Sequence, residues 1–272
     1  VGAAPLLVIS RQGGSSRPYA VSELSSNSME TTDLTPHISS RFNDDLEAVR
    51  ASLLRMGGLV EDQLRKCLSA LSEADSARAA EVVRDDEHVN LLEVGIDEAC
   101  LRILATRAPA ARDLRLIVAI TKAITDVERV GDEARKIAQI SLRLATLERP
   151  ADRYREIRHL GRLVEDMLHE ALDAFARMDA EAALRVPQLD RQVDEEYESM
   201  QRQCVTFMME DPRQIRRMLD ITWAARALER VGDHAKNIAE YVIYMVHGQD
   251  VRHTRLEEVE SRLRGRAGAR EP

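Results

Sequence analysis

Aromatic side chains are scarce in this sequence and make up only 3% of its 272 residues. Hydrophobic residues nevertheless account for 44% of the chain, and charged residues for 32%. The apolar material is therefore mainly aliphatic, and with abundant Leu, Ala, Glu and Arg it favours helices packed through aliphatic side chains. A chain of this length is sufficient for one or two domains with a sizeable core.

Excess positive charge, cysteine motifs and long apolar runs are also lacking. Lys and Arg number 39 against 47 Asp and Glu, a formal net charge of −8, whereas a nucleic-acid-binding protein needs a basic surface. The three cysteines, Cys67, Cys100 and Cys204, lie far apart in apolar helical patterns, which is typical of buried thiols in a reducing compartment. No run approaches the roughly 18 to 20 apolar residues of a membrane span. We therefore expect a cytoplasmic protein with no membrane insertion.

Apolar residues recur at helical spacing from Phe42 onward. They predict a first amphipathic helix to Leu71, a second that ends near Arg107, and a third that follows Pro109. Residues 1–36 are rich in Ser, Gly and Thr without a helical period, and they predict a disordered leader. The only tryptophan, Trp223, is expected to pack between helical bundles.

The same pattern of segments occurs twice along the chain. The segment LVED at 59–62 recurs at 163–166, 104 residues later, and ERVGD at 128–132 recurs at 229–233, 101 residues later. A repeat of this kind predicts an all-α fold of two tandem, pseudo-symmetric three-helix bundles. We place the first repeat at 37–147, the second at 148–252 and a charged C-terminal tail at 253–272.

Each ERVGD segment carries two carboxylates one helical turn apart, so both project from one face. Like charges at this spacing destabilise a helix by a few tenths of a kcal/mol, and a bound cation is one way to offset that repulsion. Oxygen ligands suit Mg, Mn, Ca or Fe and tolerate Zn. The second helix of each unit offers further carboxylates at the same spacing. The candidate metal ligands are Glu93, Asp97, Glu128, Asp132, Asp194, Glu198, Glu229 and Asp233.

Other interpretations of these acids stay open. An acid pair on a helix is most often a solvated face, and Arg129 and Arg230 are placed to neutralise the carboxylates directly. Asp126 is a further possible ligand in the first repeat. Gly131 and Gly232 mainly indicate the close approach of a neighbouring helix. No P-loop, G-x-S-x-G or G-x-G-x-x-G motif is present, so a nucleotide-binding or hydrolase signature is lacking.

These residues also carry a resemblance to the PhoU family of phosphate-signalling regulators. The segments that carry it run in order through the chain, at 37–50, 56–64, 91–132, 173–179, 193–198, 208–213 and 225–253. The resemblance implies a two-bundle helical fold, a homodimer and no catalytic activity. It also implies divalent, iron or zinc ions on the acidic faces, first at Glu128, Asp132, Glu229 and Asp233.

For function, the resemblance implies a negative regulator of the phosphate-starvation (Pho) response. Such a protein is an adaptor that links the phosphate ABC transporter, through its PstB-like ATPase subunit, to a PhoR-like sensor histidine kinase, and that modulates phosphate uptake. The alternative is a metal-dependent enzyme or a metal-binding helical scaffold that uses the repeated carboxylates. A plain structural bundle without metal is a third interpretation.

Overall fold

The computed structural model describes residues 34–147, 155–251 and 254. The chain divides into two compact units, residues 1–39 and 40–272, and every contact reported below lies within the second unit. Nearly all of the predicted leader, the boundary between the repeats near Pro150 and most of the charged tail lie outside the described residues.

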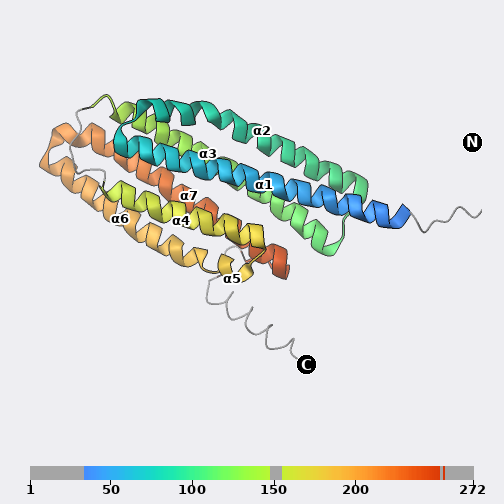
Figure 1. Cartoon of the computed structure of the whole chain (residues 1–272). Helices are drawn as coiled ribbons and strands as arrows, with labels where there is room; N and C mark the ends of the chain where they lie inside the picture. Colours follow the sequence, from blue (N-terminus) through green and yellow to red (C-terminus); the bar gives the residue numbers. More distant parts are fainter. Residues whose placement is uncertain (1–33, 148–154, 252–253, 255–272) are drawn as a thin grey trace, which may run out of the picture. The chain divides into compact units, whose positions relative to one another are not determined.

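Every regular element in the described part of the chain is helical (Figure 1), as the sequence predicts. The elements are α1 (Leu34–Glu73), α2 (Ser76–Arg107), α3 (Ala111–Leu144), α4 (Arg155–Arg177), α5 (Ala180–Ala183), α6 (Val186–Glu210), the 3₁₀ turn η1 (Pro212–Gln214) and α7 (Ile215–His247). Helices α1, α2 and α3 belong to the first repeat, and α4, α6 and α7 are their counterparts in the second. No described helix is long and apolar enough to cross a membrane.

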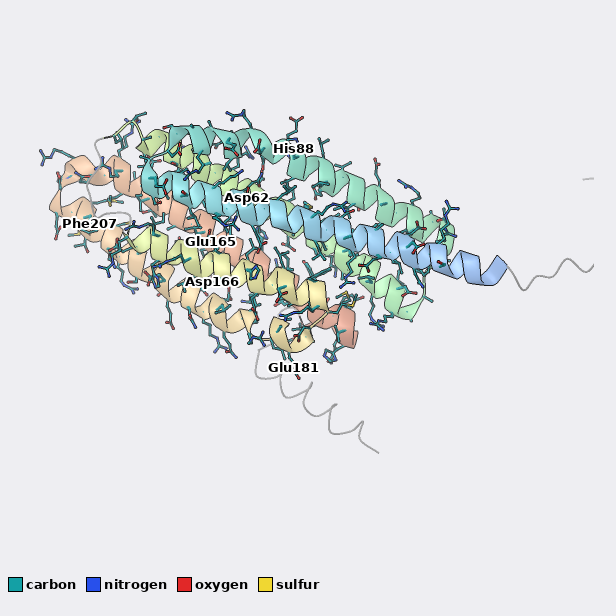
Figure 2. All side chains as sticks on the ribbon, viewed as in Figure 1. Asp62, His88, Glu165, Asp166, Glu181 and Phe207 are labelled. Atoms are coloured by element: carbon teal, nitrogen blue, oxygen red, sulfur yellow. The ribbon has the colours of Figure 1, made fainter. Side chains whose placement is uncertain are left out.

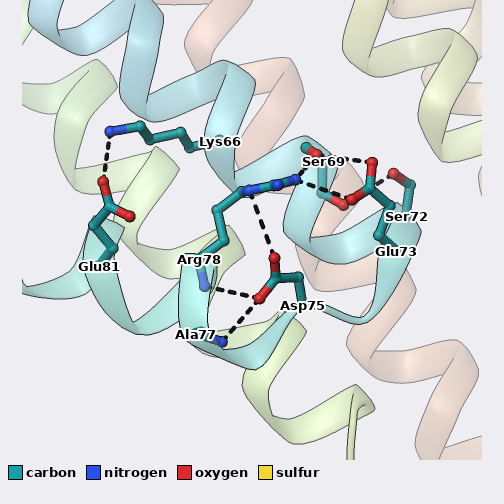
Figure 3. A network of polar contacts seen from close by, with 8 residues as sticks. All are labelled: Lys66, Ser69, Ser72, Glu73, Asp75, Ala77, Arg78 and Glu81. Atoms are coloured by element: carbon teal, nitrogen blue, oxygen red, sulfur yellow. Dashed lines mark hydrogen bonds and ion pairs between the residues drawn. The ribbon is translucent and has the colours of Figure 1, made fainter.

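The first helix of each repeat ends in the same kind of turn. Ala74 and Met178, 104 residues apart, both adopt left-handed backbone angles, and the aspartate that follows each of them caps the next helix. Asp75 Oδ1 accepts hydrogen bonds from the backbone N–H groups of Ala77 and Arg78 at 3.0 Å (Figure 3). Asp179 does the same for α5. A side-chain cap of this kind satisfies N–H groups that a helix start leaves unpaired.

The two repeats differ in their second helix. Helix α2 is continuous, whereas the equivalent stretch of the second repeat is divided into α5 and α6. Pro187 occupies the position that Val83 has in α2. Proline has no N–H and its ring clashes with the carbonyl four residues earlier, so it is accommodated in the first turn of a helix but not in its interior. The helix therefore ends at Ala183 and starts again at Val186.

Helices α3 and α7 pack against each other, α2 packs on α3, and both α4 and α6 pack on α7 (Figure 1). Small buried residues recur in the two central helices, namely Ala123, Ala134 and Ala138 and, 101 residues on, Ala224, Ala235 and Ala239. Short side chains at a helix contact allow a small interaxial distance. The three cysteines are buried and free, as predicted.

Helices α1 and α4 meet in two equivalent contacts. A Cβ atom added at Gly57 would lie 2.9 Å from Leu172 Cδ2, and one added at Gly161 would lie 2.7 Å from Leu68 Cδ2. Each glycine and each leucine is 104 residues from its counterpart, so a pseudo-twofold axis relates the two contacts. Helix α1 is unbroken at Gly57, and the glycine admits a neighbouring side chain.

Candidate functional site: two acidic helix faces

In the first repeat, the acid pair of α3 lies where that helix faces α2. Burial raises the pKa of Glu128, and the negative charges of Asp132, Glu93 and Asp86 raise it further. Carboxylates from two helices therefore share one electrostatic neighbourhood. The structure brings together Glu93, Glu128 and Asp132, and it adds Asp86, which the sequence analysis missed.

Asp86 is the most buried member of this first acidic face, with 6% of its surface exposed. Arg135 Nε lies 2.8 Å from Asp86 Oδ2, and Arg135 Nη2 lies 2.7 Å from Asp132 Oδ1. Burial raises the pKa of Asp86 even though Arg135 opposes the shift. The space for this carboxylate comes from Gly131, where an added Cβ would lie 3.3 Å from Gln63 Oε1 and 3.6 Å from Asp86 Oδ1. The glycine thus lets side chains of α1 and α2 reach α3, as the sequence indicated.

The second repeat has an equivalent acidic face between α6 and α7. Burial raises the pKa of Glu229, and Asp233 and Asp194 add to the shift while Arg226 opposes it. Asp190 and Asp233 in turn raise the pKa of Asp194, which burial has already increased. Among the described residues, Glu229 Oε2 is buried and has no hydrogen-bond partner.

An ion pair between a buried aspartate and a partly exposed cation is common to both acidic faces. Asp190 is paired with Lys236 in the second face, as Asp86 is with Arg135 in the first. The two aspartates are 104 residues apart and the two cations are 101 residues apart, which are the offsets of the repeat. This repetition is the signal from which the sequence analysis could have identified Asp86 and Asp190.

Two of the eight predicted residues lie at the margin of the acidic faces. Asp97 influences Cys100, a residue of its own helix: burial is the main cause of the raised pKa of Cys100, and the charge of Asp97 adds to it. Glu198 is exposed and pairs with Arg202 at 3.6 Å, and it is the last of several causes that raise the pKa of Asp194. A second acid four residues from the first is therefore not always directed toward the neighbouring helix.

The donor atoms of both faces are carboxylate oxygens, which suit hard cations. Glu229 Oε2, which is buried and has no hydrogen-bond partner among the described residues, is free to accept a bond from a cation. Within residues 34–147 and 155–251, however, no three His, Cys, Asp or Glu side chains are grouped so as to hold a metal ion. The side chains fit a cation in chemical type, and they would have to rotate toward one another to bind it.

Asp126 lies in a different environment, at the contact of α3 with α7. His234 Nδ1 lies 2.7 Å from Asp126 Oδ1, the Asn237 amide donates to the same oxygen at 3.1 Å, and the Tyr241 hydroxyl donates to Oδ2 at 2.7 Å. Burial alone would raise the pKa of Asp126, but these hydrogen bonds lower it below its ordinary value. Both oxygens accept hydrogen bonds that join the two repeats, so this arrangement does not favour Asp126 as a metal ligand.

Five apolar side chains are exposed at four-residue spacing on α6 and α7, and we call them the apolar patch: Val205 and Met209 on α6, and Ile215, Leu219 and Trp223 on α7. Trp223 is 64% exposed, so the prediction that it packs between bundles is wrong. Large exposed apolar groups of this kind mark sites of protein contact.

Comparison with known proteins identifies both repeats. The family model described as the PhoU domain matches residues 53–141 and 157–242. A phosphate-specific transport system accessory protein PhoU homolog from Pseudomonas aeruginosa is 54% identical over 85% of this chain and 97% of its own length. The protein named phosphate-specific transport system accessory protein PhoU from Escherichia coli K12 is 44% identical over 88% of this chain and 98% of its own length.

Two solved structures resemble the fold. The crystal structure of PhoU from Pseudomonas aeruginosa has a TM-score of 0.74 and 54% identity, and the similarity covers 76% of this chain and all of that one. The phosphate transport system regulatory protein PhoU from Streptococcus pneumoniae has a TM-score of 0.71 and 29% identity, over 77% and 99% of the two chains. These structures support the two-bundle all-α architecture.

Proposed function

Because this chain belongs to the PhoU family, we propose that it is a negative regulator of the phosphate-starvation response. In this role it is an adaptor that links the ATPase subunit of a phosphate ABC transporter to a sensor histidine kinase, acts in the cytoplasm as a homodimer and catalyses no reaction. The observation that carries the proposal is the match of the PhoU domain to both repeats, over a chain that spans nearly the whole length of relatives named as accessory proteins of phosphate transport.

The surface of the second repeat supports an adaptor role. An adaptor must expose groups whose burial drives association, and the apolar patch places Trp223 with aliphatic neighbours on one helical hairpin. Tryptophan is among the residues that contribute most to protein–protein contacts. One acidic face lies between α2 and α3, and the other lies between α6 and α7, the same two helices that carry the apolar patch. Charged and apolar contacts are therefore available on the same protein.

The test combines a gene deletion with a pull-down. Deleting the gene is expected to derepress a phosphate-scavenging reporter in phosphate-rich medium, and the wild-type gene restores repression. The Trp223→Ser protein should restore it poorly and retain less transporter ATPase or kinase in a pull-down. Leu91→Ser is the matched control because Leu91 on α2 is equally exposed, at 65%. Unchanged reporter expression after the deletion would contradict the regulatory role.

The acidic faces support a second proposal, that each repeat binds a divalent, iron or zinc cation. Glu128, Asp132 and Glu93 would hold it in the first repeat, and Glu229, Asp233 and Asp194 in the second. Burial raises the pKa values of Glu128 and Glu229, and repulsion from neighbouring carboxylates raises them further. A cation there would relieve this repulsion and would link the two helices of each face. This role stabilises a scaffold and requires no reaction.

Metal content is expected to fall when the central acid pairs are neutralised. Protein purified without chelator should contain metal by elemental analysis, and Glu128→Gln with Asp132→Asn should lower the content by about half if each repeat binds equally, since oxygen ligands must be ionised to bind. Asp166→Asn with Glu170→Gln is the control, because these acids of α4 have the same four-residue spacing outside both acidic faces. Equal loss in both variants, or no metal in the wild type, would exclude the proposed sites.

A further inference from the structure

The beginning of α4 and the last turns of α1 line a basic cavity of about 550 Å³ that is open to solvent, and its arginine side chains are exposed. Its walls carry four guanidinium groups, from Arg65, Arg155, Arg158 and Arg162. Positions 155, 158 and 162 are three and four residues apart, so they follow one face of α4. In a protein with a formal charge of −8, this is a local concentration of positive charge.

Among the residues that the structure describes, the remaining polar groups that line the cavity are two hydroxyls and one acid. Ser69 and Ser72 lie on the α1 side (Figure 3), and Glu165 is the acid that lines the cavity. Glu165 lies on α4 (Figure 2), three residues after Arg162 and thus on the same helix face. Arg65 also pairs with Asp62 at 3.1 Å. The three arginines of α4 form no ion pair with any residue that the structure describes. Three cations on one helix face repel each other, and those in the first turn also oppose the helix dipole.

The internal repeat provides a control within the same molecule. The positions on α1 that correspond to Arg155, Arg158 and Arg162 are Ala51, Leu54 and Gly58. The position on α4 that corresponds to Arg65 is His169. The same bundle contact is therefore built once without arginines, and the fold itself does not require them.

We propose that this basic cavity binds a small anion that carries two or more linked phosphoryl groups. A guanidinium group donates two parallel hydrogen bonds to phosphate oxygens, and four such groups match an anion with several negative charges. The volume lies in the range of small-molecule sites and exceeds what a single phosphate group requires. An inorganic oligophosphate and the phosphate chain of a nucleotide share this chemistry. The site is independent of the regulatory role proposed above.

Binding of defined anions to the purified full-length protein tests the proposal. By calorimetry at 150 mM salt, tripolyphosphate, ATP or both should bind at least about tenfold more tightly than orthophosphate, as several charge-assisted hydrogen bonds require. Tighter binding of tripolyphosphate would identify an inorganic ligand, and tighter binding of ATP a nucleotide; both outcomes support the site. Equal affinity for orthophosphate, or no binding, would overturn it.

Paired variants separate the cavity from general electrostatic attraction. Arg158→Glu with Arg162→Glu should weaken binding by about thirtyfold or more. Arg158→Lys with Arg162→Lys should weaken it by about three- to tenfold, because lysine keeps the positive charge but cannot donate two parallel hydrogen bonds to a phosphoryl group. Arg84→Glu with Arg102→Glu on α2 makes the same charge change at equally solvent-facing positions that do not line the cavity. An equal loss in that control, or displacement of the anion by a lower concentration of single-stranded oligonucleotide, would refute the proposal. Circular dichroism verifies that each variant is folded.

Discussion

Replacing Asp126 with alanine is expected to lower the free energy of unfolding by about 3–5 kcal/mol. Its carboxylate accepts hydrogen bonds from His234, Asn237 and Tyr241 at the contact of α3 with α7. Removing it leaves these polar groups of α7 without their shared acceptor, and an unsatisfied buried donor costs about 1–3 kcal/mol. For a chain of this size the midpoint of thermal unfolding should fall by roughly 10 °C. Differential scanning calorimetry measures the change.

Two further variants make this prediction specific. Asp166→Ala removes an exposed acid of α4 and should change stability by no more than about 0.5 kcal/mol. In an Asp126→Ala, Tyr241→Phe double variant the loss of stability should be smaller than the sum of the two single losses, because the Tyr241 hydroxyl is no longer present as an unsatisfied donor. A cost for Asp126→Ala as small as that of the surface control would show that the two repeats are held together without this network.

The Asp126 network also predicts a pH dependence. Its hydrogen bonds lower the pKa of Asp126 in the folded protein, so its contribution to stability is present above the ordinary carboxyl pKa and is lost as the pH falls toward the lowered value. The stability difference between the wild type and Asp126→Asn should therefore shrink on acidification from about pH 5 downward. A constant difference across this range would indicate that the charge of Asp126 has no part in the network.

The helical fold and its duplication were predictable from the sequence because both depend on local or repeated patterns. Apolar spacing identifies each helix, and the offsets of 104 and 101 residues identify the repeat. The ends of α2 and the boundary at Pro109 follow from capping and proline chemistry. The break between α5 and α6 was not predicted. It follows from Pro187, which lies at a position that is inside the continuous helix α2 of the first repeat.

The acidic faces were predictable only in part. Glu128 and Asp132 share a face by helix geometry, but the choice among the acids of α2 depends on how α2 rotates against α3. That rotation buries Asp86 and leaves Asp97 acting on its own helix. The Asp126 network has no counterpart in the repeat, because Ala227 occupies the position equivalent to Asp126, and its partners are more than 100 residues away. The exposure of Trp223 was also not predictable, because helical spacing does not distinguish an apolar residue of the core from one on an exposed patch.

Replacing Gly161 with valine is expected to lower the free energy of unfolding by about 2–3 kcal/mol through overpacking. Even a single added Cβ would lie 2.7 Å from Leu68 Cδ2, so α1 and α4 must separate or Leu68 must leave its position. The pseudo-twofold relation predicts a similar loss for Gly57→Val, which meets Leu172 in the same way. Urea unfolding of both variants measures the two losses.

Gly58 provides the matched control, because no atom outside its own helix segment lies within 4 Å of an added Cβ there. Gly58→Ala should stabilise the protein by about 0.5–1 kcal/mol, since alanine favours the helix and restricts the unfolded chain. Leu68→Ala should relieve part of the cost of Gly161→Val and leave the cost of Gly57→Val unchanged, because it makes space at only one of the two contacts. If Leu68→Ala relieved neither variant, or both equally, the paired glycine–leucine contacts would not be what joins the first helices of the two repeats.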